Sequence, residues 1–496
     1  MAAGTLDMSL GGLYRHKPFA RIDRWLLMAI LAFYLAFIWL IAVVSCNREY
    51  ACPAVLISTG FLISGLCALY NEAAHGVTVS FQAQVYIGTT CLLMVLVCIL
   101  VQNLQVRRRA NVRSVSGTSI STVVMPRWPL AAGVAFSLLT LFLYWHDMAN
   151  AVHTYSSDWQ EGIQSYRMSG YNSGDFDGLG VSSLTSLCYH LETAITYVFA
   201  YVALNNFVLR KSRRGDEWLL LPAVVYAGCH LLAGERFQLL QVFLNVAVMW
   251  LILYAKAHPR KGFSLGAIVK IMIILALVGL AFYVLGSFVG RNITSGPLDY
   301  ITGYFGYSYA CFGMWLDTPT FVRTDIFAPE TLISIYRDLS QITGDKSLVY
   351  TLHFDFRVSN GVSLGNLYSA CKSWISDYGV VGMYVMACLY ALLASGVFRM
   401  TGRRMHKCIS IATIVYSFFG FALFDLPLGD NLSTTLLASS TVPIFIVIYV
   451  LVILIDDFNK KTTVSSDGDT HPDPAAIPKR RTIPVASHVT KVGGTS

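Results

Sequence analysis

The chain alternates long apolar runs with shorter polar segments over most of its length. Many runs are close to 20 residues, the length that a helix needs to cross a hydrocarbon core about 30 Å thick. Helices satisfy their own backbone hydrogen bonds inside lipid. The pattern therefore predicts an all-α, polytopic transmembrane helix bundle of about 11 spans, within a range of about 10–12. The predicted spans are 25–45, 53–70, 83–103, 128–146, 183–209, 217–233, 237–255, 264–287, 379–398, 408–425 and 435–455.

Basic residues are concentrated in four of the connecting loops. Cytoplasmic loops of membrane proteins carry an excess of lysine and arginine, so these four are predicted to be cytoplasmic. The alternating segments are then extracytoplasmic, with 147–182 as a first loop and 288–378 as the one large loop of a transmembrane domain covering 25–455. The four basic loops lie around 107–127, 210–214, 256–261 and 399–407.

The first hundred residues conflict with this orientation. Segment 1–24 carries Arg15, Lys17, Arg21 and Arg24, which favours a cytoplasmic N-terminal segment. Three crossings before residue 104 would instead place segment 1–24 outside. Either one of the first three runs does not cross fully, or these basic residues lie on the other face. The first interpretation is favoured because 53–70 is short and rich in Gly, Ser and Cys.

Composition agrees with a membrane protein and narrows its chemistry. Hydrophobic residues make up 55% of the chain and charged residues only 13%, whereas soluble domains have about a quarter charged residues. The net charge of +8 is explained by the cytoplasmic loops, so no nucleic-acid partner is predicted. The 11 cysteines form no CxxC pair, and no metal or cofactor site is predicted; Cys46 and Cys52 are interpreted as small core residues rather than a disulfide. The polar segment 456–496 is predicted to be a disordered cytoplasmic tail.

The motif Gly234-Glu235-Arg236 lies between two predicted spans, on the extracytoplasmic side. A guanidinium at this position can bind a phosphate through two parallel hydrogen bonds. The alternative is an arginine that extends to the interface and only marks a helix end. Glu235 is a candidate ion-pair partner of Arg236, which would then not be left for a phosphate. The sequence does not distinguish these two arrangements.

Arg291 follows another predicted span, and the aromatic run Tyr300–Tyr309 comes soon after it. Aromatic faces stack on the apolar faces of sugar rings, so Tyr300 and Tyr304 are candidate sugar-binding residues. The alternative is an aromatic belt at the membrane interface. In the first extracytoplasmic loop, Arg167 is a further candidate in a segment that would cover the site.

Polar and aromatic residues alternate from His353 to Arg357, which predicts an extended segment. His353 or Asp355 can act as a general base, and Arg357 can stabilise negative charge on a leaving phosphate. The alternative is an Asp355–Arg357 pair that only orders the loop. Further along, Asp377 is a third candidate base, while Asn366 and Tyr368 are candidate substrate-binding residues. No role is assigned to residues 318–349.

The order of these motifs resembles the Wzy-type oligosaccharide repeat unit polymerases, which make O-antigen and capsular polysaccharide in bacteria. The resemblance covers roughly 183–400 and is strongest over Asn366–Gly382, where Asn366-x-Tyr368 precedes Asp377-Tyr-Gly379-x-x-Gly382. Related ligases place a histidine next to an asparagine ahead of such glycines. Here Leu364 and Gly365 precede Asn366, which favours a polymerase.

The resemblance implies a GT-C-like glycosyltransferase in the bacterial inner membrane, with its active site facing the periplasm. It would join undecaprenyl-diphosphate-linked oligosaccharides without nucleotide sugars, and a chain-length regulator is a candidate partner. The implied diphosphate-binding residues are Arg236, Arg291 and Arg357, and the implied bases are His353, Asp355 and Asp377. The alternatives are a lipid-linked oligosaccharide flippase and a ligase-like transferase. A flippase is disfavoured because the sequence shows neither repeated halves nor interrupted helices.

Overall fold

The computed structural model describes residues 18–110, 121–173, 181–212, 214–258, 277–286, 295–350, 352, 354–402 and 408–468. Within these ranges the regular structure is helical, apart from one short hairpin of β1 (Arg357–Ser359) and β2 (Val362–Gly365). Eight of the described helices are long and apolar enough to cross a membrane. The predicted all-α, polytopic helical architecture is therefore confirmed.

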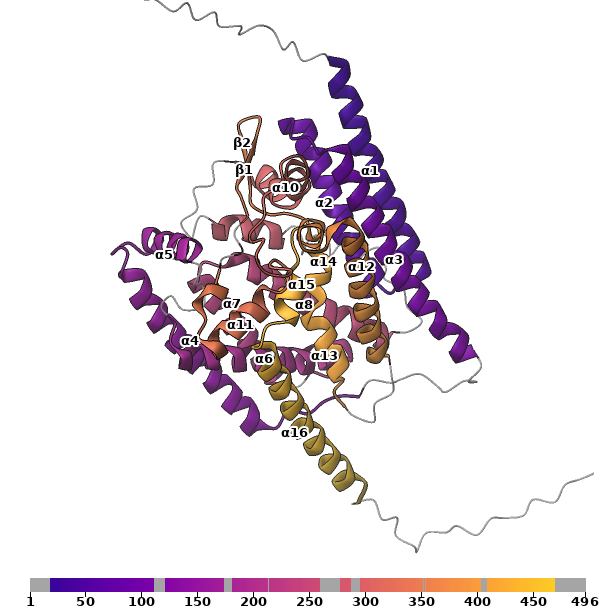
Figure 1. Cartoon of the computed structure of the whole chain (residues 1–496). Helices are drawn as coiled ribbons and strands as arrows, with labels where there is room; N and C mark the ends of the chain where they lie inside the picture. Colours follow the sequence, from indigo (N-terminus) through magenta and orange to yellow (C-terminus); the bar gives the residue numbers. More distant parts are fainter. Residues whose placement is uncertain are drawn as a thin grey trace, which may run out of the picture.

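Three neighbouring helices form one side of the molecule (Figure 1): α1 (Pro18–Ser45), α2 (Pro53–His75) and α3 (Phe81–Ala110). Their connections are short, so consecutive helices must run antiparallel. Each one qualifies as a membrane span, including α2, for which the sequence favoured an incomplete crossing. The start of α1 lies on the side of the β-hairpin, and the end of α3 lies toward the opposite side (Figure 1).

The second group of helices contains α4 (Arg127–His153), α6 (Ser183–Val208), α8 (Arg236–Ala257) and α16 (Thr441–Gly468), all of which qualify as spans over most of their length. Between α6 and α8, the 3₁₀ helix η1 (Asp216–Leu220) leads into the short helix α7 (Leu221–Leu232). Helix α16 continues through the first 13 residues of the predicted tail, and Asp456 is buried there. Residues 469–496 lie outside the described part.

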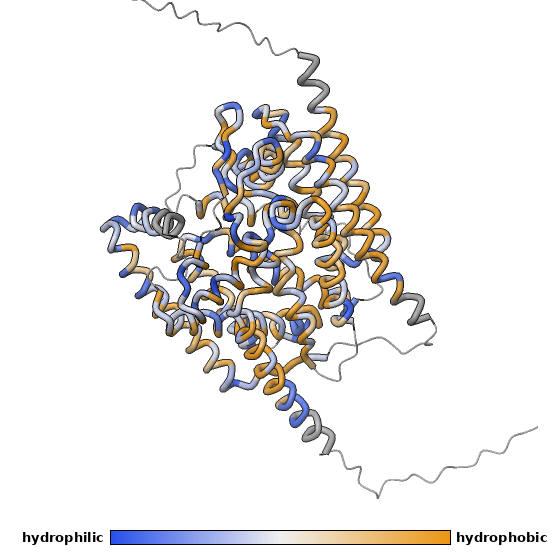
Figure 2. The backbone as a smooth tube through the Cα atoms, in the orientation of Figure 1, coloured by the Kyte–Doolittle hydropathy of each residue, from blue (hydrophilic) through white to orange (hydrophobic). Residues whose placement is uncertain are grey.

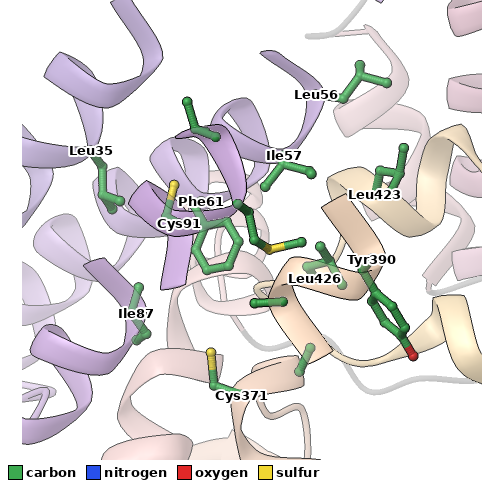
Figure 3. Packing of buried hydrophobic residues seen from close by; sticks show 14 of the residues in the cluster. Leu35, Leu56, Ile57, Phe61, Ile87, Cys91, Cys371, Tyr390, Leu423 and Leu426 are labelled. Carbon is green, nitrogen blue, oxygen red and sulfur yellow. The ribbon is translucent and has the colours of Figure 1, made fainter. Parts of the chain in front are cut away.

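Apolar side chains from several helices fill the main core. Phe61 and Ile57 of α2 pack between Leu35 and Ile87 on one side and Leu423 on the other (Figure 3). Hydropathy follows this arrangement, with apolar residues along the long helices and polar residues concentrated in the hairpin and at the far end of α16 (Figure 2).

The predicted large loop is mostly regular structure. Helix α10 (Pro297–Asp317) packs along α2, and Gly306 permits the contact because a Cβ there would lie 2.6 Å from the backbone nitrogen of Ala68. Asn71 donates to the Thr302 carbonyl, and Tyr309 donates to the Phe61 carbonyl. The aromatic run therefore lies on a half-buried helix. After α10 come α11 (Ile333–Thr343), η2 (Lys346–Leu348) and the hairpin.

Helix α12 (Ala370–Thr401) begins nine residues before the predicted span and bends at Gly379, whose φ of 70° is in the left-handed region that favours glycine. The predicted span 408–425 is divided into α13 (Ile411–Phe418) and α14 (Gly420–Phe424), followed by α15 (Asn431–Leu436). Of the predicted span 264–287, only the helical segment Leu277–Gly286 is described.

Candidate functional site

The link between α7 and α8, residues 233–236, forms a tight turn that we call the α8 junction. Gly234 has a φ of 73°, and Ala233 is buried. The turn ends where Arg236 begins α8, so Glu235 and Arg236 lie at the helix N-terminus. Free backbone N–H groups at such an end favour anions.

Glu235 is paired with His230 in the last turn of α7. The His230 Nδ1 atom lies 3.1 Å from Glu235 Oε2, and its Nε2 atom lies 2.9 Å from the Tyr189 hydroxyl of α6. The ionised carboxylate can only accept, so Nδ1 carries the proton in this arrangement. His230 is 5% exposed, and the Tyr226 ring packs against it edge to face at 4.8 Å. The structure thus assigns Glu235 a partner other than Arg236.

The predicted first extracytoplasmic loop contains α5 (Trp159–Ser173), which packs on α4. Ile163 and Tyr166 of this helix share a small core with Ala233. Arg167 follows Tyr166 directly, so the backbone of this candidate residue lies next to that small core. The side chains of Arg167 and Arg236 are outside the described residues, as is all of Arg291.

Aromatic contacts connect α10 to the same junction. The Tyr304 ring lies 5.6 Å from Phe237 of α8 and 5.1 Å from Phe282. Tyr300 lies 6.2 Å from Phe282 and 5.7 Å from Tyr283. Tyr304 therefore packs beside the first turn of α8, where Arg236 begins the helix, and Tyr300 is connected to it through Phe282.

A second group of polar residues lies where α10, the hairpin and α12 meet, and we call it the loop cluster. Its centre is the ion pair of Lys372 and Glu330, which are 2% and 0% exposed at the side chain. The ammonium group also lies 3.7 Å from the centre of the Phe354 ring and 5.6 Å from that of Trp315. A cation in this position gains from the ring quadrupole.

Arg357 is engaged within the loop cluster. Its Nε atom donates to the Tyr368 hydroxyl at 3.0 Å, and its guanidinium donates to both Thr318 oxygens. Asp355 lies 3.7 Å from the guanidinium and accepts from the Thr320 hydroxyl. Burial raises the pKa of Tyr368 above its usual value. This geometry favours the interpretation in which Arg357 orders the loop.

Asp377 holds the segment for which the sequence assigned no role. Its two oxygens accept the backbone N–H groups of Glu330 and Thr331, at 3.2 and 2.6 Å. Nearby, the Arg323 guanidinium hydrogen-bonds Asp325 and lowers the pKa of that carboxyl to about 2. Segment 318–349 is thus attached to the first turns of α12 by these hydrogen bonds.

The cavity in the loop cluster is too small for a sugar. It measures about 60 Å³ and is lined by residues that include Phe354, Asp355 and Lys372. Water occupies about 30 Å³ in the liquid, so there is space for one or two molecules. Asn366 is half-buried in the link between β2 and α12, and His353 lies outside the described residues.

The predicted site residues therefore form two groups at opposite ends of α10. Tyr304 lies beside the α8 junction, whereas Arg357 binds Thr318 just after the end of α10. A helical rise of 1.5 Å per residue separates Tyr304 from Thr318 by about 20 Å. The sequence missed Glu330, Lys372 and the pairing of His230 with Glu235, although Lys372 is an unusual charge in an apolar helix.

No family model, curated protein or solved structure matches this chain.

Proposed function

We propose that this protein is a glycosyltransferase that polymerises undecaprenyl-diphosphate-linked oligosaccharide repeat units in the bacterial inner membrane. The observation that carries the proposal is the convergence at the α8 junction. Segments far apart in the sequence contribute to it. The Tyr304 ring packs on Phe237, the residue after Arg236, and shares Phe282 with Tyr300. Tyr166, the residue before Arg167, shares a small core with Ala233. Cationic groups suit the lipid diphosphate, and aromatic faces suit the glycan.

The reaction depends mainly on stabilising the negative charge of the leaving diphosphate and on positioning the two substrates. A hydroxyl of the acceptor unit attacks the anomeric carbon of the donor glycan, and the bond to the diphosphate breaks with its electron pair leaving on phosphate. The diphosphate is a good leaving group once its developing charge is met by Arg236 and the α8 N-terminus. No nucleotide sugar is required, and the site faces the periplasm in the proposed orientation.

A comparison of Arg236→Ala with Arg357→Ala tests where the diphosphate binds. We expect Arg236→Ala to reduce polymer formation by about 100-fold or more while single repeat units persist, because a donor aimed at developing charge contributes on this scale. Arg357→Ala should cost at most about tenfold, since Arg357 is bonded within the loop. Glycan chain length on gels, normalised to protein level, measures both. Long polymer from the Arg236 variant would overturn the assignment.

One observation favours a second candidate, a transporter of the same lipid-linked oligosaccharide. The sequence suggested uninterrupted helices, but α13, α14 and α15 are short and separated, as in transporters with discontinuous helices. Purified protein mixed with lipid-linked units in detergent distinguishes the two functions. Chain growth without a second compartment requires a transferase, and movement of unextended units between leaflets of vesicles would favour transport.

A further inference from the structure

The glycosyl transfer releases a proton from the attacking hydroxyl, and the predicted bases are poorly placed to take it. Both oxygens of Asp377 accept backbone N–H groups. Asp355 is engaged by Thr320 and lies at the far end of α10 from Tyr304. His353 is outside the described residues. Among the residues that the structure describes, a base near the α8 junction has to come from another part of the chain.

Glu235 is such a group. It directly precedes Arg236 in the α8 junction, and its side chain is 36% exposed while its partner His230 is 7% exposed. His230 uses one carboxylate oxygen, Oε2. The carboxylate is therefore held in a fixed orientation by a buried imidazole while it remains accessible from the surface. Orientation by a neighbouring group is what a positioned general base requires.

We infer that Glu235 accepts the proton of the attacking acceptor hydroxyl, and that His230 and Tyr189 position its carboxylate. This rests on the proposed function. As the hydroxyl oxygen bonds to the anomeric carbon, its O–H bond breaks and the proton moves to Glu235. The carbon–oxygen bond to the diphosphate breaks in the same step, with the electron pair leaving on phosphate. Because Glu235 is partly exposed, the proton then passes to water.

The surroundings of Glu235 supply few competing charges. The described titratable groups that face it are Tyr144 of α4, Tyr189 of α6, and Tyr226 and His230 of α7. Phenols are neutral near pH 7, so these tyrosines add no charge beside Glu235 at that pH.

The test uses the full-length protein in detergent. It is mixed with lipid-linked repeat units extracted from cells that lack this protein. We expect Glu235→Gln to lower kcat by about 100-fold, the usual effect of losing a general base, with KM changed by less than about threefold. The acidic limb of the pH–rate profile should disappear. Glu235→Asp should restore part of kcat, and His230→Gln should shift the acidic limb, which a purely structural residue would not do.

Glu161→Gln is the matched control, because Glu161 lies on α5 and bonds Ser156 outside the junction. It should behave as wild type. Binding of undecaprenyl diphosphate to each variant separates loss of the base from loss of the fold. Wild-type kcat and pH profile in Glu235→Gln would overturn the inference while leaving the polymerase proposal intact. If the wild-type protein itself makes no polymer, the proposed function fails, and the inference fails with it.

Discussion

At the scale of single residues, the left-handed backbone of Gly234 shapes the pairing within the α8 junction. Glu235 and Arg236 are adjacent, so their order suggested a mutual ion pair as readily as a phosphate-binding arginine. The left-handed Gly234 turns the chain so that Glu235 meets His230. Pairings that depend on one backbone dihedral angle cannot be inferred from residue order alone.

The ion pair of Lys372 and Glu330 gives the clearest prediction for a single residue. Lys372→Ala should lower the free energy of unfolding by about 3–5 kcal/mol, because it leaves a fully buried carboxylate without its counter-charge. The apparent Tm of the detergent-solubilised protein measures this. A Lys372→Met, Glu330→Leu double variant should recover most of the loss, since it removes both charges together.

Glu330→Gln serves as the control for the same pair, because it keeps the side-chain shape and leaves the ammonium group unpaired. It should also be destabilised, though less strongly, since the Phe354 ring still contacts the ammonium. A Lys372→Ala protein with the Tm of wild type would show that the pair is not closed in the folded protein.

At the scale of elements, the apolar runs predicted the long helices well and the broken ones poorly. Runs such as 25–45 and 183–209 become continuous helices because neither contains a proline or a glycine. The run 408–425 is equally apolar, yet its helix divides at Phe419. The reason lies on α8, where Asn245 satisfies backbone groups at the break. A hydropathy pattern carries no information about such a partner.

Asn245 therefore yields a prediction at this scale. Its amide donates to the Phe418 carbonyl at 3.0 Å and accepts the Phe421 N–H at 2.7 Å, while it also bonds the Tyr197 hydroxyl. Asn245→Leu should cost about 2–4 kcal/mol, because buried backbone groups lose their partners. Thermal unfolding measures the loss. Thr89→Val, which removes a partly buried hydroxyl from α3, should cost less than half as much; equal costs would contradict the role of Asn245.

At the scale of the whole molecule, the candidate site could be predicted only in part. The sequence predicted one diphosphate site containing Arg236, Arg291 and Arg357. Residue order gives no distances between residues in loops, so it could not separate them. The ordered length of α10 separates Arg357 from the α8 junction by about 20 Å. Regular structure inside a segment expected to be a loop thus divided one predicted site into two groups.

The three N-terminal helices lead to a final prediction about orientation. If the basic end of α3 is cytoplasmic, three antiparallel crossings place the start of α1 on the extracytoplasmic face, against the basic residues Arg21 and Arg24. Extensive packing of α1 on α2 should override those charges. An N-terminal epitope and a Val358→Cys hairpin variant should both react with membrane-impermeant reagents in cells with a permeabilised outer membrane. A C-terminal epitope should react only after the inner membrane is opened, and an N-terminal epitope that behaves like it would mean that α1, α2 or α3 does not cross.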